Sequence, residues 1–188
     1  MGQRRMAVVD REVASPASPI VLRPSSDDDV PAMLDIYRHH IAHGVGDLGT
    51  FEPTSFDVDD LKARRKNMRK HRLPHLVATI DGAVAGYAYA VLFRKRPAYR
   101  FTVKHSVYVH PDRLHIGIGR ALLLALIQAC ACAGYRQMIG YIDSANVASL
   151  QLHERCGFRK VGYLRAVAFR FGEWTDTVIV QRAIGPEM

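Results

Sequence analysis

The spacing of apolar residues along the chain predicts four helices. Between Val30 and Ile41, apolar side chains recur with helical spacing, behind the capping sequence Ser25-Ser26-Asp27-Asp28-Asp29. A charged helix is predicted at 56–72, and a long apolar helix at 119–133, where Gly134 supplies the stop. A fourth helix is predicted at 145–156.

Other stretches have the short apolar runs and two-residue alternation that are typical of β-strands. Strands are predicted at 20–23, 76–80, 84–91, 102–109, 137–142, 161–169 and 175–182, with the turn Asp81-Gly82 joining the second and third into a hairpin. This order indicates an α/β (α+β) fold with a mixed central β-sheet and helices on both faces. We expect one domain at 19–185 after a mobile tail, residues 1–18, that closes on a Pro/Ser cluster.

The formal net charge of +8 over 188 residues suggests an anionic partner without identifying it. Much of the excess lies in the basic run at 62–72, which lacks interleaved aromatic residues. We interpret this run as a solvated helix face and expect no nucleic-acid partner. No apolar run is long enough to span a bilayer, so we expect no membrane association, and we expect no metal.

The three cysteines of the chain indicate in which cellular compartment the protein works. Cys130, Cys132 and Cys156 are an odd number in a chain that shows no export signal. We interpret all three as buried small hydrophobic residues of a protein in the reducing cytoplasm.

The stretch most informative about chemistry runs from Ser106 to Leu122. A predicted strand ends there in a turn, Gly117-Ile118-Gly119 follows, and a helix begins. Glycine lets a backbone approach a ligand closely, and the unpaired N–H groups of a helix N-terminus attract anions. The stretch therefore suggests a pyrophosphate cradle, although a tight strand-to-helix turn also needs glycine for purely steric reasons.

Several separated stretches together resemble the GCN5-related N-acetyltransferases (GNAT), and within them the phosphinothricin and methionine sulfoximine acetyltransferases. They are residues 99–109, the Gly117-Ile118-Gly119 turn, Asn146 to Ser149 with His153 to Phe158, and Phe171 to Asp176. The resemblance runs from about residue 20 to residue 183. It implies the GNAT acyl-CoA N-acyltransferase fold and an acyltransferase that uses acetyl-CoA as co-substrate.

The resemblance also implies which residues contact the co-substrate. The backbone of Val107, Tyr108 and Val109 would pair with the pantetheine arm, and Asn146 would hydrogen-bond to it, although a helix cap is an equal reading of Asn146. The N–H groups that would wrap the pyrophosphate belong to His115, Ile116, Gly117, Ile118, Gly119 and Arg120.

For catalysis, the N–H of Tyr108 or Val109 would stabilise the oxyanion, and His153 would give a proton to the leaving thiolate. A competing reading of His153 is a helix residue packed under the sheet. Lys104 stands where the subfamily carries a glutamate base, and a protonated lysine cannot act as that base. His105, Glu52 or a bound water are the candidate replacements. Leu114 and His115 depart from the usual start of the phosphate loop.

For the acceptor, the resemblance implies a site between the loop at 44–52, with Glu52, and the segment that contains Pro97, Ala98 and Tyr99. The predicted reaction transfers acetyl to the amine of a small amino-acid-like substrate by direct attack. The alternatives are another amine (an antibiotic, a polyamine or a protein N-terminus) and a catalytically weakened acetyl-CoA-binding member. The resemblance further implies a homodimer.

Overall fold

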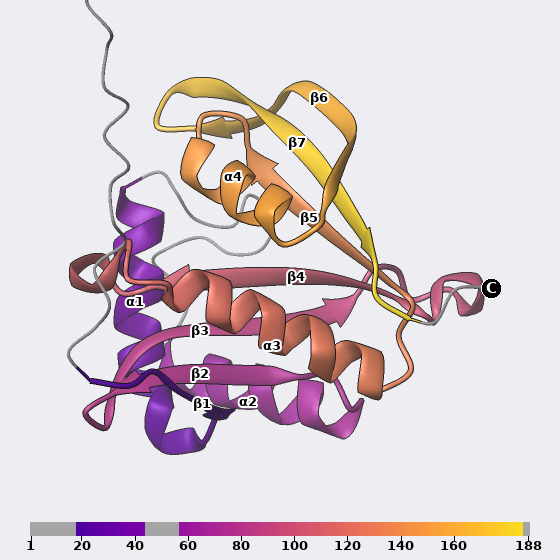
Figure 1. Ribbon diagram of the computed structural model, residues 1–188. Coiled ribbons are helices and arrows are strands. Elements are labelled where there is room, and N and C mark those ends of the chain that lie inside the picture. The colour runs from indigo at the N-terminus through magenta and orange to yellow at the C-terminus, as the bar shows by residue number, and fades with distance from the viewer. Residues whose placement is uncertain (1–17, 44–56, 186–188) are drawn as a thin grey trace, which may run out of the picture.

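Figure 1 shows the computed structural model, which describes residues 18–43 and 57–185. Its helices are α1 (Val30–Ala42), α2 (Val58–Lys70), α3 (Ile118–Cys132) and α4 (Val147–Arg155). Its strands are β1 (Val21–Pro24), β2 (His75–Ile80), β3 (Ala83–Leu92), β4 (Thr102–Val109), β5 (Gln137–Asp143), β6 (Arg159–Arg170) and β7 (Glu173–Ala183). The predicted tail, apart from residue 18, and the predicted loop at 44–53 with Glu52 lie outside the described residues.

The strands form one mixed sheet in the order β1-β2-β3-β4-β5-β7-β6. Among the described strands, β4 and β5 are the one parallel pair, and the other neighbours are antiparallel. Helices α1 and α2 lie on one face, while α3 and α4 lie on the other (Figure 1). The predicted fold class, with helices on both faces of a mixed sheet, is confirmed.

The pairing between β4 and β5 is short, and this shapes the site. Residues 102–104 of β4 pair with residues 137–139 of β5, and no further pairs follow along these strands. Beyond that point β4 stays paired with β3 as far as Val109, while β5 stays paired with β7 as far as Asp143. The two strands therefore diverge, and the second half of β4 presents an open edge toward β5 (Figure 1).

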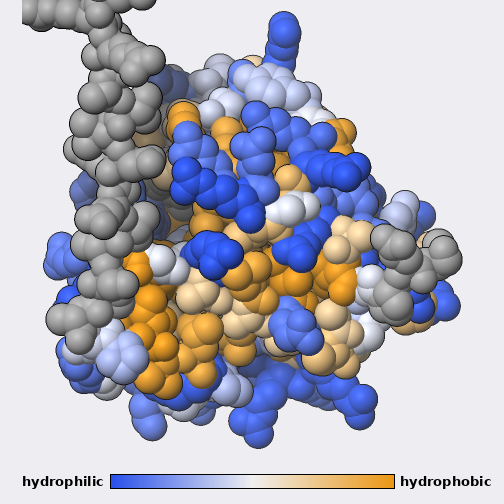
Figure 2. Space-filling model, viewed as in Figure 1, coloured by the Kyte–Doolittle hydropathy of each residue, from blue (hydrophilic) through white to orange (hydrophobic). Residues whose placement is uncertain are grey.

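Helix α3 anchors the sheet from the face that carries α4. Its inner side chains are fully or almost fully buried against β2, β3 and β4 (Ile118, Leu122, Leu123, Leu126, Ile127 and Cys130). Arg120 is the one charged side chain in the helix, so the surface over α3 remains largely apolar (Figure 2). Burying these side chains stabilises the fold, at about 25 cal/mol for each Å² of apolar surface removed from water.

Two expectations about burial need correction. Cys130 and Cys156 are buried as predicted, but Cys132 is exposed, because it lies on the outer side of the last turn of α3. The basic run at 62–72 is not wholly a solvated face: the Arg65 side chain is buried and donates to the Ser25 carbonyl and to the Asp27 carboxylate. This arginine therefore ties α2 to the segment that precedes α1.

Two further features concern ligands and membranes. Within residues 18–43 and 57–185, no helix combines the length and the apolar content that crossing a membrane requires. Across the same described ranges, no three His, Cys, Asp or Glu side chains gather into a group that could hold a metal ion.

Candidate active site

The direction of each peptide group on β4 follows from two hydrogen bonds to β3. The His110 N–H donates to the Ala85 carbonyl over 2.9 Å, and the Thr102 carbonyl accepts from the Phe93 N–H over 3.0 Å. Peptide groups alternate along a strand, so the even-numbered residues between them, including Tyr108, direct their N–H groups toward β3. Val107 and Val109 direct theirs to the open edge. Of the two amides predicted as oxyanion donor, Val109 is the one that faces this edge, and Tyr108 is not.

The Tyr108 side chain belongs to a buried aromatic cluster on the α1 side of the sheet. Its ring stacks on Tyr87 at 5.0 Å and lies 5.7 Å from His40. The His40 Nε2 donates to the Val109 carbonyl over 2.7 Å. Burial lowers the pKa of His40, so this ring is neutral near pH 7 with its proton on Nε2. The cluster therefore holds the open end of β4 in place.

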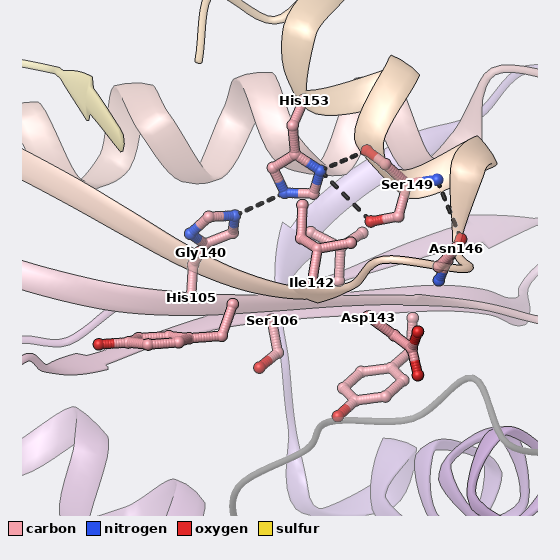
Figure 3. A pocket seen from close by; sticks show the side chains of 11 residues that line it. His105, Ser106, Gly140, Ile142, Asp143, Asn146, Ser149 and His153 are labelled. Atoms are coloured by element: carbon pink, nitrogen blue, oxygen red, sulfur yellow. Dashed lines mark hydrogen bonds between the residues drawn. The ribbon is translucent and has the colours of Figure 1, made fainter. Parts of the chain in front are cut away.

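A pocket lies along the open edge, between β4, β5 and the start of α4 (Figure 3). In Figure 3 the His105 ring points up toward His153, whereas the Ser106 side chain points to the other side of the strand. The lining residues come from β4 (His105, Ser106, Val107, Tyr108), from β5 (Gly140, Tyr141, Ile142, Asp143) and from α4 with its cap (Asn146, Ser149, His153).

The N-terminus of α4 brings Asn146 and Ser149 to this pocket. The Asn146 side-chain oxygen accepts a hydrogen bond from the Ser149 N–H over 3.0 Å and so caps the helix. The cap uses the amide oxygen and holds the rest of the side chain in the pocket wall. Both readings of Asn146 made from the sequence are therefore compatible with its position.

His153 and His105 form a buried pair beneath the open edge. Their Nε2 atoms lie 2.8 Å apart, the His153 Nδ1 lies 2.7 Å from the Ser149 carbonyl oxygen, and the His105 Nδ1 lies 3.0 Å from the Ile139 carbonyl oxygen. Burial, and after it the charge of His153, lowers the pKa of His105. Burial also lowers the pKa of His153, and the Ser149 carbonyl opposes that shift. The two rings therefore do not both carry charge.

The Gly-rich turn lies at the start of α3, close to the pocket. His115 has φ 63° and Gly117 has φ 91°, so two left-handed residues flank Ile116 before the helix begins at Ile118. Alternation of this kind turns successive N–H groups into one concavity, a nest for an anion. A Cβ on Gly119 would lie 3.3 Å from Leu152 and 3.5 Å from Val109, so glycine permits close packing of α3 on α4 and β4. The turn fits the predicted pyrophosphate cradle.

The Lys104 side chain lies on the other face of the sheet from His105. Its Nζ is 5.9 Å from the centre of the Tyr141 ring, whereas His105 lies over Gly140, the neighbour of Tyr141 on β5. His105 therefore does not occupy the place of the missing glutamate, and its part as a replacement base stays a prediction.

The predicted acceptor residues Pro97, Ala98 and Tyr99 form an exposed 3-10 turn before β4. Tyr99 packs edge-on against Phe93 at 5.6 Å, and this turn lies at the end of β4 that pairs with β5. The pocket lies along the other half of the strand, so a single chain does not bring the turn and the pocket together. Their joint role stays a prediction, as does that of Glu52.

Sequence reasoning missed the partnership of His105 with His153 and the part that Gly140 plays in it. A Cβ on Gly140 would lie 2.9 Å from the His105 ring, so this glycine provides the space for the imidazole. Side chains alternate along a strand, so Val103 and His105 lie on the same face of β4. The apolar Val103 could therefore have indicated that His105 is buried as well.

The fold and this site define an acetyltransferase of the GNAT class, and comparison with known proteins agrees. The model of the acetyltransferase (GNAT) family matches residues 43–158. The chain is 46% identical over 159 residues to a phosphinothricin N-acetyltransferase of Alcaligenes faecalis, which covers 84% of this chain and 79% of that relative. The chain therefore belongs to the GNAT acetyltransferase family, as its sequence motifs predicted.

Two further relatives place it within that family. It is 33% identical over 162 residues to the L-methionine sulfoximine/L-methionine sulfone acetyltransferase of Salmonella typhimurium strain LT2, covering 86% of this chain and 93% of the relative. The structure of a GNAT superfamily phosphinothricin acetyltransferase from Sinorhizobium meliloti, in complex with AcCoA, superposes with a TM-score of 0.82 at 38% identity. That match covers 88% of this chain and 89% of the other.

Proposed function

We propose that this enzyme transfers the acetyl group of acetyl-CoA to the amine of a small amino-acid-like acceptor of the phosphinothricin or methionine sulfoximine kind. The observation that carries the proposal is the open edge of β4, where Val107 lines a pocket and Val109 follows it next to Gly119 of the Gly-rich turn. The names of the relatives support the acceptor class. The relative from Sinorhizobium meliloti binds AcCoA, which supports the co-substrate.

The donor would be held by backbone more than by side chains. The Val107 and Val109 peptide groups would pair with the pantetheine arm like an added strand, with Asn146 beside them. The N–H groups between His115 and Arg120 would receive the pyrophosphate, and the exposed Arg113 and Arg120 would add positive charge around it. Leu114, which directly precedes these N–H groups, is 46% exposed.

The chemistry is a direct attack. The acceptor nitrogen forms a bond to the thioester carbonyl carbon and the carbon–sulfur bond breaks. The nitrogen loses two of the three protons of its ammonium form and keeps one as the amide N–H, the sulfur takes up one proton, and one is released to water. The Val109 N–H would stabilise the oxyanion, a contribution of about 3 kcal/mol in comparable sites. His153 lines the pocket and would supply the proton for the thiolate.

Lys104 shapes both the rate and the choice of acceptor. A lysine ammonium donates hydrogen bonds and accepts none, so proton removal from the amine falls to water rather than to a side chain at this position. Its positive charge beside Tyr141 would attract an acidic acceptor, which fits an amino acid that carries a second anionic group.

We also propose that the enzyme is a cytoplasmic homodimer. Exposed apolar side chains gather on the β6–β7 ribbon (Val161, Tyr163, Leu164, Val167, Phe169 and Trp174), and Phe171 in the turn between the strands is 73% exposed. Apolar surface of this kind marks association sites, and a second copy is the occupant we propose. Free thiols at all three cysteines support a reducing compartment.

An acceptor panel tests the function. The purified enzyme is incubated with acetyl-CoA and phosphinothricin, methionine sulfoximine, ordinary amino acids, a polyamine or an N-terminal peptide, and products are read by mass spectrometry. We expect the N-acetyl product of an amino-acid-like acceptor at the highest kcat/KM. A polyamine or peptide in first place would replace the acceptor class. Tight acetyl-CoA binding without any acetylated product would favour the catalytically weakened alternative that Lys104 suggests.

A further inference from the structure

The hydrogen bonds of the His105–His153 pair require more protons than two neutral rings carry. Each Nδ1 faces a carbonyl oxygen, at 3.0 Å from Ile139 and 2.7 Å from Ser149, and a carbonyl oxygen only accepts hydrogen bonds. Both Nδ1 atoms therefore need a proton. The 2.8 Å contact between the two Nε2 atoms needs another. Three contacts require three protons, whereas two neutral imidazoles carry only two.

We propose that the two rings share one additional proton, so that the pair carries a single positive charge and acts as the proton source for the leaving thiolate. A fourth proton would set two N–H groups against each other across 2.8 Å, so the pair takes one and no more. This inference rests on the proposed acetyl transfer for its use, although the charge of the pair can be measured without any reaction. His105, whose Nε2 contacts the His153 Nε2, is then a positioning residue that acts through His153.

The surroundings suit one charge without a counter-ion. Strand β5 contributes the Ile139 carbonyl and Gly140, α4 contributes Ser149, and Phe158 packs on both rings at 5.1 Å. None of these groups is ionised. The other titratable side chains that line the pocket are Tyr108, Tyr141 and Asp143. Burial opposes the charge and lowers the pKa of both rings, whereas the hydrogen bonds to the Ile139 and Ser149 carbonyl oxygens act in the other direction and stabilise it.

The Ser149 hydroxyl gives the proton a route to the pocket. Its Oγ lies 3.4 Å from the His153 Nδ1, and the same serine lines the pocket wall. In the step we propose, the hydroxyl proton forms the S–H bond of the departing thiol while the His153 Nδ1–H bond breaks and restores the hydroxyl. The pair is left with two protons, one on the His105 Nδ1 and one between the rings, and is neutral.

Strand β5 leaves space for the His105 ring because residue 140 is a glycine. A Cβ at position 140 would lie 2.9 Å from both His105 Cε1 and Val180 Cγ2, which leaves no room for a side chain there. His75 on β2 offers a control, because it is also buried but stacks on Tyr87 and Tyr89, outside the pocket. The same substitution at His75 and at His105 separates a loss of stability from a loss of the shared proton.

The first test is made on the free enzyme. Protein labelled with ¹⁵N-histidine is followed by NMR against pH, with His105→Gln and His153→Gln to assign signals among the nine histidines. At pH 7 we expect both Nδ1 atoms of the pair to be protonated and the Nε2 signals to be averaged by a shared proton. An unprotonated Nδ1 on either ring, or two unprotonated Nε2 atoms, at pH 7 would show two neutral rings and overturn the proposal.

The second test uses turnover. In His105→Gln we expect acetyl-CoA affinity by calorimetry to stay within about twofold, while kcat falls roughly 10- to 100-fold and its limb at alkaline pH moves. In His75→Gln the pH profile should keep its shape. An unmoved profile in His105→Gln would sink the positioning role. A wild-type enzyme without any turnover would instead refute the acetyl transfer, and the NMR result would still decide the charge of the pair.

Discussion

The His40 Nε2 donates a hydrogen bond to the Val109 carbonyl over 2.7 Å, and this bond ties α1 to the open end of β4. Val109 is also the residue whose N–H faces the proposed thioester. A helix on one face of the sheet therefore holds the Val109–His110 peptide, which directly follows the Tyr108–Val109 peptide whose N–H would stabilise the oxyanion. The bond is the most direct link between the fold and the proposed chemistry.

The first prediction concerns this bond. His40→Ala leaves the Val109 carbonyl without its donor, which should cost about 1 kcal/mol in stability and lower kcat about fivefold. His40→Gln supplies an N–H donor and should recover part of the rate. Steady-state kinetics and urea unfolding measure both effects. Equal kcat in His40→Ala and the wild type would show that the Val109 peptide needs no such support.

A second prediction concerns the position of the missing base. Lys104→Glu puts a carboxylate on the acceptor side of β4 and should raise kcat/KM for a neutral amino-acid acceptor. Lys104→Gln is the matched control, because it removes the positive charge without adding a base. A rate in Lys104→Glu no higher than in Lys104→Gln would mean that this position does not serve proton transfer.

The free energy of unfolding should decrease in mild acid, and His75 accounts for part of this decrease. Burial, and after it the charges of Arg65 and Arg64, lowers the pKa of His75 to about 3. In the unfolded chain a histidine takes up a proton near pH 6.5, so unfolding binds a proton between pH 6.5 and 3 and stability decreases as the pH falls through this range.

His75→Phe keeps an aromatic ring between α2 and the sheet but removes that proton. The slope of the unfolding free energy against pH should become shallower by up to about 1.4 kcal/mol for each pH unit below 6. Urea unfolding at pH 7, 6 and 5 measures the slope in both proteins. An unchanged slope would show that His75 is protonated, or exposed, in the folded enzyme.

Much of this organisation could be predicted from sequence. Local period and turn residues placed the helices and strands, because the capping run before Val30 and the Gly134 stop act over a few neighbouring residues. The Gly117-Ile118-Gly119 turn likewise marked its own helix start. The His105–His153 pair could not be predicted, because it depends on how β4 and α4 meet across 48 residues of sequence.

Side-chain burial on α2 and α3 could not be predicted from the sequence either. Cys130 and Cys132 are separated by two positions, so they face different sides of α3, yet both were expected to be buried because the whole stretch is apolar. The same limit applies to Arg65, which the basic run concealed. Composition reports the average environment of a stretch and does not resolve its faces.

This difference gives a prediction about thiol reactivity. Burial raises the pKa of Cys130 to about 12, and burial also raises the pKa of Cys156. In the native enzyme a thiol reagent should therefore react quickly with one cysteine, Cys132, and with all three after denaturation. Cys132→Ser should abolish the fast reaction. A fast native reaction that persists in this variant would show that Cys130 or Cys156 becomes accessible in the folded enzyme.

The most direct test of the account is a crystal structure of the enzyme with acetyl-CoA. The account predicts that the pantetheine amides pair with the backbone of Val107 and Val109 and that the pyrophosphate contacts N–H groups between His115 and Arg120. The thioester should lie within reach of Ser149. Density for the co-substrate elsewhere, with the edge of β4 beyond Lys104 still open at saturating concentration, would contradict it.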